Sequence, residues 1–382
     1  MDEGKAVDAI YLDLRKVFDT VPHQRLVNKL EGYGIKGNLL KWVEDFLRDR
    51  TQFVSINSAS SSRVHVTSGV PQGSVLGPIL FIYYINDMPD LVNCSMKIFA
   101  DDTKAYMAIP TEKERDNLQD CIDKLNSWTD NWLLRFNTDK CKVLHIGRNN
   151  PRYNYYMTNG NDRNKIEETV AEKDLGVIID PSLDFDAHIT TMVKKANKLV
   201  GMLMRSICHK SKDIIIPLYK ALIRSILEYG SAVWNPRLRK HINLIEGVQR
   251  RVTRCIIGTK GMTYQQRLDF LKLPSLEFRR FRGCLIEVYK IVHNFYDPKT
   301  TSTLFQRCTT NRTRGHEHKL LKHATNTSLF RSFFTNSIVN IWNNLAGETV
   351  DAPSVNAFKN RIDKELREYM SCTDLSFFFA GR

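Results

Sequence analysis

The sequence has no hydrophobic run long enough to cross a bilayer. Its longest apolar stretch, VLGPILFIYYIN at 75–86, has 12 residues and is followed by Asp87, whereas a membrane-spanning helix needs about 20. The first residues also lack the pattern of a secretory signal peptide. We therefore expect no transmembrane helix, no membrane partner and an intracellular location, in the cytoplasm, the nucleus or both.

Paired cysteines are missing as well. The eight cysteines are scattered singly, without a C-x-x-C pair, which favours reduced thiols over a disulfide scaffold. We predict no disulfide. Cys308, His316, His318 and His323 form the one cluster that suggests a metal, but their spacing fits no standard zinc module, so we interpret them as surface polar residues.

Acidic residues are scarce in the middle and later part of the chain. Residues 186–350 hold 28 Lys and Arg against 10 Asp and Glu, a net charge of +18, whereas the rest of the chain carries −4. This asymmetry indicates a polyanionic partner, with solvated helix faces as the alternative. Arg250, Arg251 and Arg254 share a helical neighbourhood and are the leading candidates for contacts to nucleic-acid phosphates.

Internal repeats and low-complexity tracts are absent, and the texture of the chain changes along its length. Up to about residue 185, short apolar β-prone segments such as AVDAIYLDL at 6–14 alternate with helical patterns. Long basic helical stretches follow, with a Thr-rich, Pro-containing segment near residue 300. The pattern predicts an α+β region with a small antiparallel sheet and packed helices, then two helical regions. The predicted domains are residues 1–185, 186–300 and 301–382.

Three carboxylates stand at the ends of predicted β-segments. Asp13 follows the first of these segments, and FADDTKAY at 99–106 places Asp101 and Asp102 side by side at a turn. Adjacent carboxylates repel each other unless a cation lies between them, one takes a proton, or both face water. Carboxylate oxygens are what Mg²⁺ prefers, and two ions about 4 Å apart promote phosphoryl transfer. Solvated turn aspartates are the alternative.

Three longer segments give the acidic residues a context. IYLDLRKVFDTVPH at 10–23, SGVPQGSVLGPILF at 68–81 and the FADDTKAY segment resemble, in order and spacing, the signature blocks of reverse transcriptases of non-LTR retrotransposons, the jockey-like and chicken-repeat-like LINE elements. The similarity continues through WLLRFNTDKCKVLHIG at 132–147 and EKDLGVIID at 172–180, and it covers essentially the whole chain.

The resemblance implies the palm, helical thumb and C-terminal region of an RNA-directed DNA polymerase. Its partners would be an RNA template, a DNA primer or target and deoxynucleoside triphosphates, and its cofactor two Mg²⁺ or Mn²⁺ ions. Asp13 and Asp101 would be the main metal ligands, Asp102 a supporting acid, and Lys140 the lysine that neutralises or protonates the leaving pyrophosphate.

The same resemblance assigns the nucleotide pocket. Leu14 would offer its backbone to the nucleotide phosphates, and Phe18 would be the aromatic gate that excludes a ribose 2′-hydroxyl. Gln72 would line the pocket, with Gly69 and Gly73 allowing close backbone approach. The loop at Leu175 would support the primer end. Asp19, in the first block, we interpret as structural.

The start of the sequence departs from the family pattern. A polymerase of this kind has a basic fingers region ahead of the first aspartate block, whereas this sequence begins twelve residues ahead of Asp13. We therefore expect little or no activity from the isolated chain. A non-catalytic nucleic-acid-binding remnant of a retroelement is the main alternative. An RNA-templated RNA polymerase is a second alternative, disfavoured by the FADD block at 99–102 and by the aromatic residue at position 18. The oligomeric state is not predicted.

Overall fold

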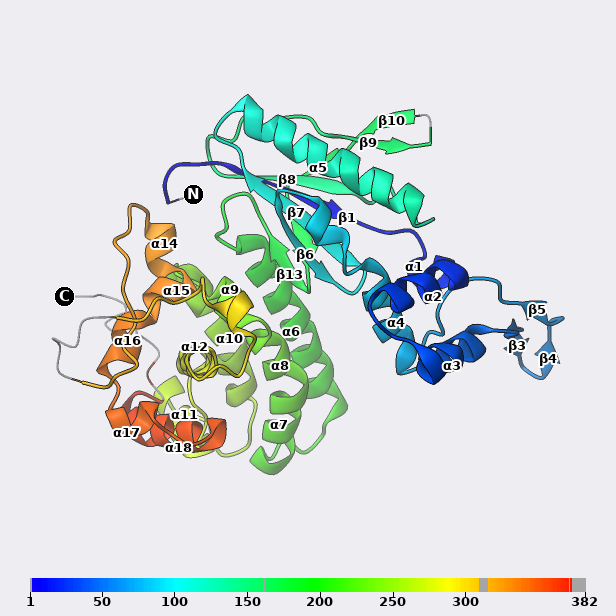
Figure 1. Cartoon of the computed structure of the whole chain (residues 1–382). Coiled ribbons are helices and arrows are strands. Elements are labelled where there is room, and N and C mark those ends of the chain that lie inside the picture. The colour runs from blue at the N-terminus through cyan, green and yellow to red at the C-terminus, as the bar shows by residue number, and fades with distance from the viewer. Residues whose placement is uncertain (1, 161, 309–314, 371, 373–382) are drawn as a thin grey trace. The chain divides into compact units, whose positions relative to one another are not determined.

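The computed structural model describes residues 2–160, 162–308, 315–370 and 372, and it divides the chain into two compact units. The first comprises Glu3–Gly176 with Asp180–Ser182, and the second comprises Val177–Ile179 and the chain from Leu183 onward, with Asp2. The first unit mixes sheet and helix and the second is largely helical (Figure 1). This is the α+β class predicted from the sequence. The domain limits at 185 and 300 stay predictions.

The first unit is built on a five-stranded sheet with the order β11-β8-β1-β7-β6. The neighbouring strands pair antiparallel except β11 and β8, which run parallel at one edge. The small antiparallel sheet predicted from the sequence is therefore present, with one parallel pair added. The strands are β1 (Val7–Leu12), β6 (Ser95–Phe99), β7 (Asp102–Ala108), β8 (Lys142–Ile146) and β11 (Glu167–Thr169).

Helices and short strands complete this unit. Residues 24–49 form two helices and residues 51–65 form short antiparallel pairs, as their apolar spacing and alternation predict. The helices are α1 (Val17–Thr20), α2 (His23–Gly32), α3 (Gly37–Leu47), α4 (Leu76–Ile85), the 3₁₀ helix η1 (Met88–Leu91) and α5 (Glu112–Asn131). The short strands are β2 (Thr51–Gln52), β3 (Ser55–Ile56), β4 (Ala59–Ser60), β5 (Val64–His65), β9 (Tyr156–Asn159), β10 (Asp162–Lys165) and β12 (Glu172–Asp174).

Helix α5 covers the sheet because one of its faces is apolar. Leu118, Ile122, Leu125 and Trp128 recur at three- and four-residue spacing and are buried. The Thr111 hydroxyl caps the helix by accepting a hydrogen bond from the Lys113 backbone N–H. The helix packs against β7 and β9 (Figure 1), so it holds the strand that follows the acidic turn.

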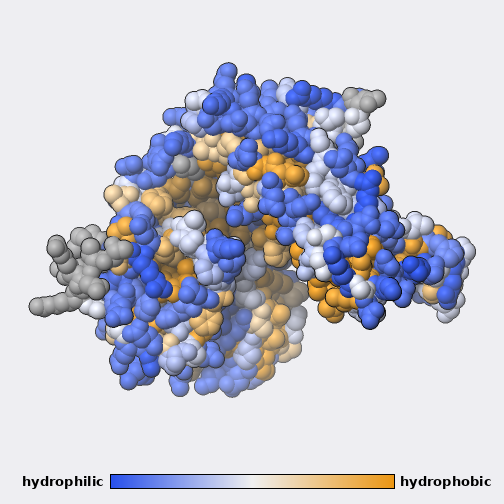
Figure 2. Space-filling view, in the orientation of Figure 1, coloured by the Kyte–Doolittle hydropathy of each residue, from blue (hydrophilic) through white to orange (hydrophobic). Residues whose placement is uncertain are grey.

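Helix α4 is apolar on all sides, and only half of it is buried. Leu80 and Phe81 are 3% and 1% exposed within the core of the first unit, whereas Ile79 and Ile82 are 45% and 50% exposed. Figure 2 shows hydrophobic surface where α3 and α4 lie. The longest apolar run of the sequence therefore forms a short helix that packs one face into the core and exposes the other. No helix among the described residues is long and apolar enough to span a membrane.

The second unit contains two hydrophobic clusters, one within residues 177–276 and the other within 278–366. Helix α12 follows the first cluster and packs against α9, α10 and α18. The elements are β13 (Val177–Ile179), α6 (Asp186–Ser206), α7 (Lys212–Leu218), the π-helix η2 (Tyr219–Arg224), α8 (Ser225–Glu228), α9 (Ser231–Trp234), α10 (Arg239–Arg254), α11 (Tyr264–Leu271), α12 (Leu276–Val292), α13 (Pro298–Thr301), α14 (Ser328–Ser332), α15 (Phe334–Ser337), α16 (Val339–Asn344), α17 (Gly347–Val350), α18 (Val355–Glu365) and the 3₁₀ helix η3 (Arg367–Tyr369).

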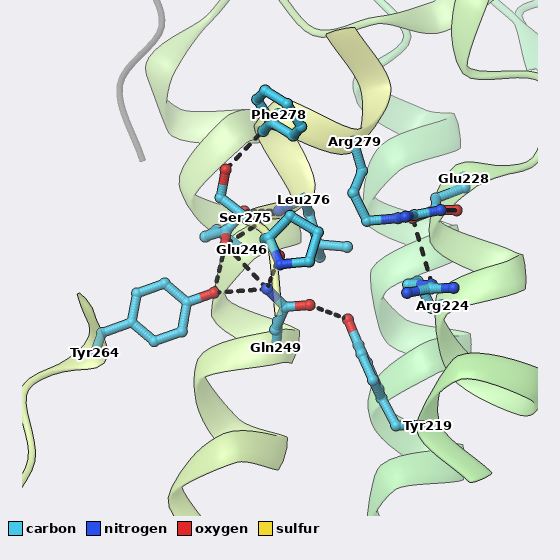
Figure 3. A network of polar contacts seen from close by, with 11 residues as sticks. Tyr219, Arg224, Glu228, Glu246, Gln249, Tyr264, Ser275, Leu276, Phe278 and Arg279 are labelled. Carbon is cyan, nitrogen blue, oxygen red and sulfur yellow. Dashed lines mark hydrogen bonds and ion pairs between the residues drawn. The ribbon is translucent and has the colours of Figure 1, made fainter. Parts of the chain in front are cut away.

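A buried polar network joins α10, α11 and α12 (Figure 3). The Glu246 carboxylate is 1% exposed and accepts hydrogen bonds from the Tyr264 hydroxyl and, at 3.0 Å, from the Leu276 backbone N–H. Gln249 accepts from the Tyr219 hydroxyl at 2.6 Å and donates to a backbone carbonyl. Burial raises the pKa of Glu246, and its contact with the first turn of α12 favours the charged form. The network thus fixes the start of α12.

The structure also bears on the cysteine and histidine predictions. All eight cysteines are free thiols. The interpretation of His316 as a surface residue is wrong, because it is buried and its Nε2 lies 3.0 Å from the Trp342 carbonyl oxygen. Its ring packs edge-on against the Trp342 indole. An aromatic partner 26 positions away is not visible in local spacing.

Candidate active site

Strand register brings Asp13 to the acidic turn. In the antiparallel pair of β1 and β7, Leu12 lies opposite Thr103, so Asp13 follows β1 where Asp102 begins β7. Adjacent strands lie about 5 Å apart. Phe99 pairs with Asp102 across the β6–β7 hairpin, which leaves Ala100 and Asp101 as its two-residue turn. Three carboxylates from two distant segments therefore meet at one end of the sheet.

The turn that presents Asp101 is strained at Ala100. This residue has φ 53°, in the left-handed region, where a residue with a Cβ is less stable by about 1–2 kcal/mol. Two-residue hairpins favour such dihedrals because they match the twist of the flanking strands. The hairpin thus requires an unfavourable backbone conformation at Ala100, the residue beside Asp101.

A cavity of about 440 Å³ collects most of the predicted site residues. Asp13 and Asp101 line it together, although one follows β1 and the other lies in the turn between β6 and β7. The other lining residues come from the segments that follow β1, precede α4 and follow α5. They are Leu14, Arg15, Lys16, Val17, Phe18, Gln72, Asn137 and Lys140.

Asp102 lines a second cleft, of about 600 Å³, which shares Asp13 and Lys140 with the first. Burial raises the pKa of the Asp102 carboxyl, and the charges of Asp101, Asp174 and Asp13 raise it further. The direction is the one expected from carboxylate repulsion, although burial is the larger cause. Leu175, predicted to support a primer end, lines the same cleft.

Lys140 is positioned by the segment that pairs with the residues around Asp13. The Asn137 backbone N–H donates to the Asp13 carbonyl at 2.7 Å, and Leu14 forms a β-bridge with Phe136. The Lys140 ammonium lies 3.4 Å from Asp13 Oδ2, and its side chain is 67% exposed. This lysine is therefore a cation beside the carboxylate, accessible to a ligand.

Phe18 and Gln72 form another wall of the 440 Å³ cavity. The Phe18 ring lies 4.8 Å from the Phe81 ring, and the Gln72 amide donates to Asp19 Oδ1 at 3.3 Å. Gly69 permits this packing, because a Cβ there would lie 2.6 Å from the Phe18 carbonyl oxygen. Asp19 thus holds the loop that carries Gln72, which is a structural contact.

Some predicted residues lie elsewhere. Gly73 lines neither cavity and has open space around its Cα, although its φ of 83° still favours glycine. The three arginines of α10 belong to the second unit. Arg250 packs 5.0 Å above the Tyr264 ring, whereas Arg251 and Arg254 are exposed. The exposed pair is therefore more accessible to a phosphate than Arg250.

Sequence reasoning missed several residues of the cavities. Arg15 and Lys16 line the 440 Å³ cavity beside Asp13, and they stand in the same quoted block, directly after Asp13 and Leu14. Their position in that block could have indicated that they lie at the same site as Asp13. In the second cleft Lys104 forms an ion pair with Asp174. Strand register brings these two together, and the sequence pattern did not indicate it.

The carboxylates at the two cavities suit divalent metal ions by their chemistry. Asp13 and Asp101 offer carboxylate oxygens to one cavity, with a further carboxylate at Asp102, and hard cations prefer oxygen donors. Within the described residues, no group of three or more His, Cys, Asp or Glu side chains already converges as a metal site. The residue types fit magnesium. Two carboxylates line the cavity, and within the described residues no larger cluster of ligand side chains has formed around one point.

Comparisons with known proteins show which family this region is similar to. Residues 2–179 match the family described as "Reverse transcriptase (RNA-dependent DNA polymerase)". The chain is 30% identical over 295 residues to the "RNA-directed DNA polymerase from mobile element jockey" of Drosophila melanogaster, covering 72% of this chain and 31% of that protein. It is 28% identical over 268 residues to the "Probable RNA-directed DNA polymerase from transposon X-element" of the same species, covering 67% and 29%.

The chain thus spans about a third of the length of these relatives. Among solved structures, a telomerase from Candida albicans is similar at 11% identity and a TM-score of 0.33, over 70% of this chain and 49% of that one. The family match covers the sheet, the acidic turn and both cavities. Residues 2–179 therefore belong to the reverse transcriptase family, and the relatives of the chain are the polymerases of non-LTR retrotransposons such as jockey.

Proposed function

We propose that the first unit catalyses template-directed addition of deoxynucleotides to the 3′-hydroxyl of a primer, with RNA as the template and DNA as the primer or target. The observation that supports this most is the 440 Å³ cavity. Asp13, Phe18, Gln72, Asp101 and Lys140 come from separate parts of the chain and line it together. The second unit, with its excess of Lys and Arg, would hold the nucleic acid, and the protein would act in the cytoplasm or the nucleus.

Asp13 and Asp101 would hold the catalytic Mg²⁺ or Mn²⁺ ions, with Asp102 as a supporting acid. Two such ions supply activation of the attacking hydroxyl and stabilisation of the leaving oxygen in an in-line phosphoryl transfer. Burial, and then repulsion by the neighbouring carboxylates, raises the pKa of Asp102 and so disfavours its ionised form. A ligand cation beside it would lower that pKa again.

The remaining residues act on the nucleotide. Arg15 and Lys16 place two cations at the cavity beside Asp13, where they would attract the triphosphate and orient it. Lys140, 3.4 Å from Asp13, would neutralise or protonate the pyrophosphate as it leaves. The Phe18 ring, fixed against Phe81, would occupy the space that a ribose 2′-hydroxyl needs.

Primer extension on an RNA template tests the proposal. The chain is compared alone and fused behind the region that precedes the matched segment in the jockey polymerase of Drosophila melanogaster, because the match covers only 31% of that relative. The proposal predicts deoxynucleotide incorporation by the fusion and little or none by the chain alone. The upstream region without this chain serves as the control and should be inactive.

Two outcomes would contradict the account. A fusion that is folded, as judged by circular dichroism and thermal unfolding, yet incorporates no deoxynucleotide would overturn the catalytic proposal. Robust extension by the unfused chain would support the proposed polymerase activity. It would overturn only the expectation that a further segment is needed for this activity.

A further inference from the structure

The second unit has a small cavity lined by arginine and serine. It has a volume of about 190 Å³ and lies among the start of α12, helices α14 and α15, and residues 235–237. This volume is enough for a phosphate group with a few waters, since one water needs about 10–15 Å³ of such space. It is smaller than the pockets of about 300–1,000 Å³ that enclose whole small molecules. Any nucleotide bound here would keep its base outside.

One arginine of this cavity is buried without enough partners. Arg280 is 1% exposed, and its Nε donates to Asn235 Oδ1 at 3.3 Å. Both of its Nη groups are buried and have no hydrogen-bond partner among the described residues. An arginine in a protein does not lose its proton, and a buried donor left unsatisfied destabilises the fold. The two Nη groups of Arg280 can therefore donate hydrogen bonds to a ligand that offers acceptor oxygens.

Two further arginines lie at the same cavity and are exposed. Arg237 donates to the Ser328 hydroxyl at 3.2 Å, and Arg331 lines the cavity from α14. The acid in the lining is Glu277, which is 3.4 Å from Arg239. Three guanidinium groups thus face one carboxylate in the lining. The lining therefore has two more positive than negative charges. Because two of the arginines are exposed and the third is buried, this charge attracts an anion from the surface into the cavity.

The chemistry of the ligand follows from these charges. A guanidinium presents parallel N–H donors that match two oxygens of a phosphate. A phosphate monoester carries about −1.5 to −2 at neutral pH, close to the excess charge of the lining, whereas a phosphodiester within a strand carries only one charge. The serine hydroxyls of Ser328, Ser332 and Ser337 are further polar groups at the cavity.

We propose that this cavity, the Arg280 pocket, binds the terminal phosphate of a nucleic-acid strand. The strand continues outward past Arg237 and Arg331, and the phosphate oxygens accept from the Nη groups of Arg280. The inference takes nucleic acid as the ligand from the proposed function, but it concerns binding by the second unit and needs no polymerisation.

The test measures binding of the intact chain to a labelled single-stranded oligonucleotide at physiological salt, by fluorescence anisotropy. Three forms of one sequence are compared, with a 5′-phosphate, with a 3′-phosphate and with hydroxyls at both ends. We expect one phosphorylated form to bind at least about tenfold more tightly than the hydroxyl form, the factor of one charge-assisted hydrogen-bond pair. The form that binds identifies the strand end.

Variants connect the preference to the pocket. Arg280→Met keeps the length of the side chain and should abolish the preference for the terminal phosphate. Arg331→Gln changes an exposed side chain of the cavity, so the fold should be kept and the preference should fall severalfold. Arg205→Gln, an exposed arginine of α6 outside the pocket, is the matched control and should keep it.

Equal affinity for all three oligonucleotides would overturn the inference, and so would a preference that survives in both Arg280→Met and Arg331→Gln. Neither result affects the proposed polymerase, whose failure is detected separately by primer extension.

Discussion

At the scale of single residues, the Phe18 ring lies at the cavity that Asp13 and Asp101 line, and it is fixed 4.8 Å from the Phe81 ring. Replacing it by valine removes the bulk while keeping an apolar group. We expect Phe18→Val to lower the preference for deoxynucleotides over ribonucleotides by at least about tenfold, because a cavity contact of this size is worth about 1–3 kcal/mol. The measurement is the ratio of incorporation rates for the two nucleotide types in the fusion.

The matched control is Phe53→Val, at a residue that is 48% exposed and lies outside both cavities. An unchanged ratio in Phe18→Val would show that the ring does not select the sugar.

Asp102 gives a prediction about pH. Its pKa is raised in the folded state, chiefly by burial and then by the neighbouring carboxylates. The folded protein therefore binds this proton more tightly than the unfolded chain, and stability falls as pH rises from the usual aspartate pKa through the raised one. Asp102→Asn removes this penalty, so it should raise the free energy of unfolding at pH 7 and raise it less at pH 4.

Urea denaturation without divalent cations at the two pH values measures this difference. Asp45→Asn, at an exposed carboxylate of α3, is the control and should give no gain. A gain for Asp102→Asn that is equal at both pH values would mean that ionisation of this carboxyl is not its cause.

At the scale of secondary-structure elements, the loop before α4 depends on a glycine. At Gly69 a Cβ would lie 2.6 Å from the Phe18 carbonyl oxygen, and φ is 89°; at Gly73 φ is 83°, but nothing lies within 4 Å. Gly73→Ala should therefore lower the free energy of unfolding by about 1 kcal/mol, the cost of the left-handed backbone. Gly69→Ala adds an overlap with backbone and should lower it by about 3 kcal/mol.

Chemical denaturation of the two variants compares them directly. Equal losses would show that the loop moves away from Phe18 without cost, and Gln72 would then not be held at the cavity by this packing.

How far these elements follow from the sequence depends on the range of the interactions. The apolar spacing of α5 and the alternation around residues 51–65 are local patterns, and they indicate the helix and the short strands that form there. The pairing of Leu12 with Thr103 joins residues far apart in the sequence. Periodicity therefore could not show that Asp13 and Asp101 lie at one site, and only the resemblance of the family blocks indicated it.

Contacts to which the family blocks assign no role could not be placed in the same way. The buried Asp8 hydrogen bonds His145 and the Tyr155 hydroxyl, each at 2.7 Å. These partners are more than 130 positions away, and no local pattern predicts a carboxylate within a buried strand. The ion pair of Lys104 with Asp174 was missed for the same reason, since strand register decides it.

At the scale of the whole molecule, charge is separated along the chain, with +18 in residues 186–350 and −4 elsewhere. Binding to nucleic acid should therefore weaken steeply as salt rises, because each phosphate contact releases a counterion. Arg251 and Arg254 are exposed on α10. We expect replacement of both by glutamine to reduce the slope of log K against log salt by about 2 for duplex DNA.

Titrations of the intact chain with duplex DNA at several salt concentrations measure this slope. Arg48→Gln, an exposed arginine of the first unit, is the control. An affinity that does not change with salt would show that the basic residues are a solvated surface, and an unchanged slope in the double variant would place the contacts elsewhere.

The central claim is that Asp13 and Asp101 form one site of nucleotide transfer. Its most direct test is the rate of deoxynucleotide incorporation on an RNA template by the fusion carrying Asp101→Asn, relative to the same fusion carrying Asp45→Asn. The account predicts a rate at least about 100-fold lower for Asp101→Asn, the usual effect of removing a group that stabilises charge in the transition state. Equal rates in two equally folded fusions would contradict it.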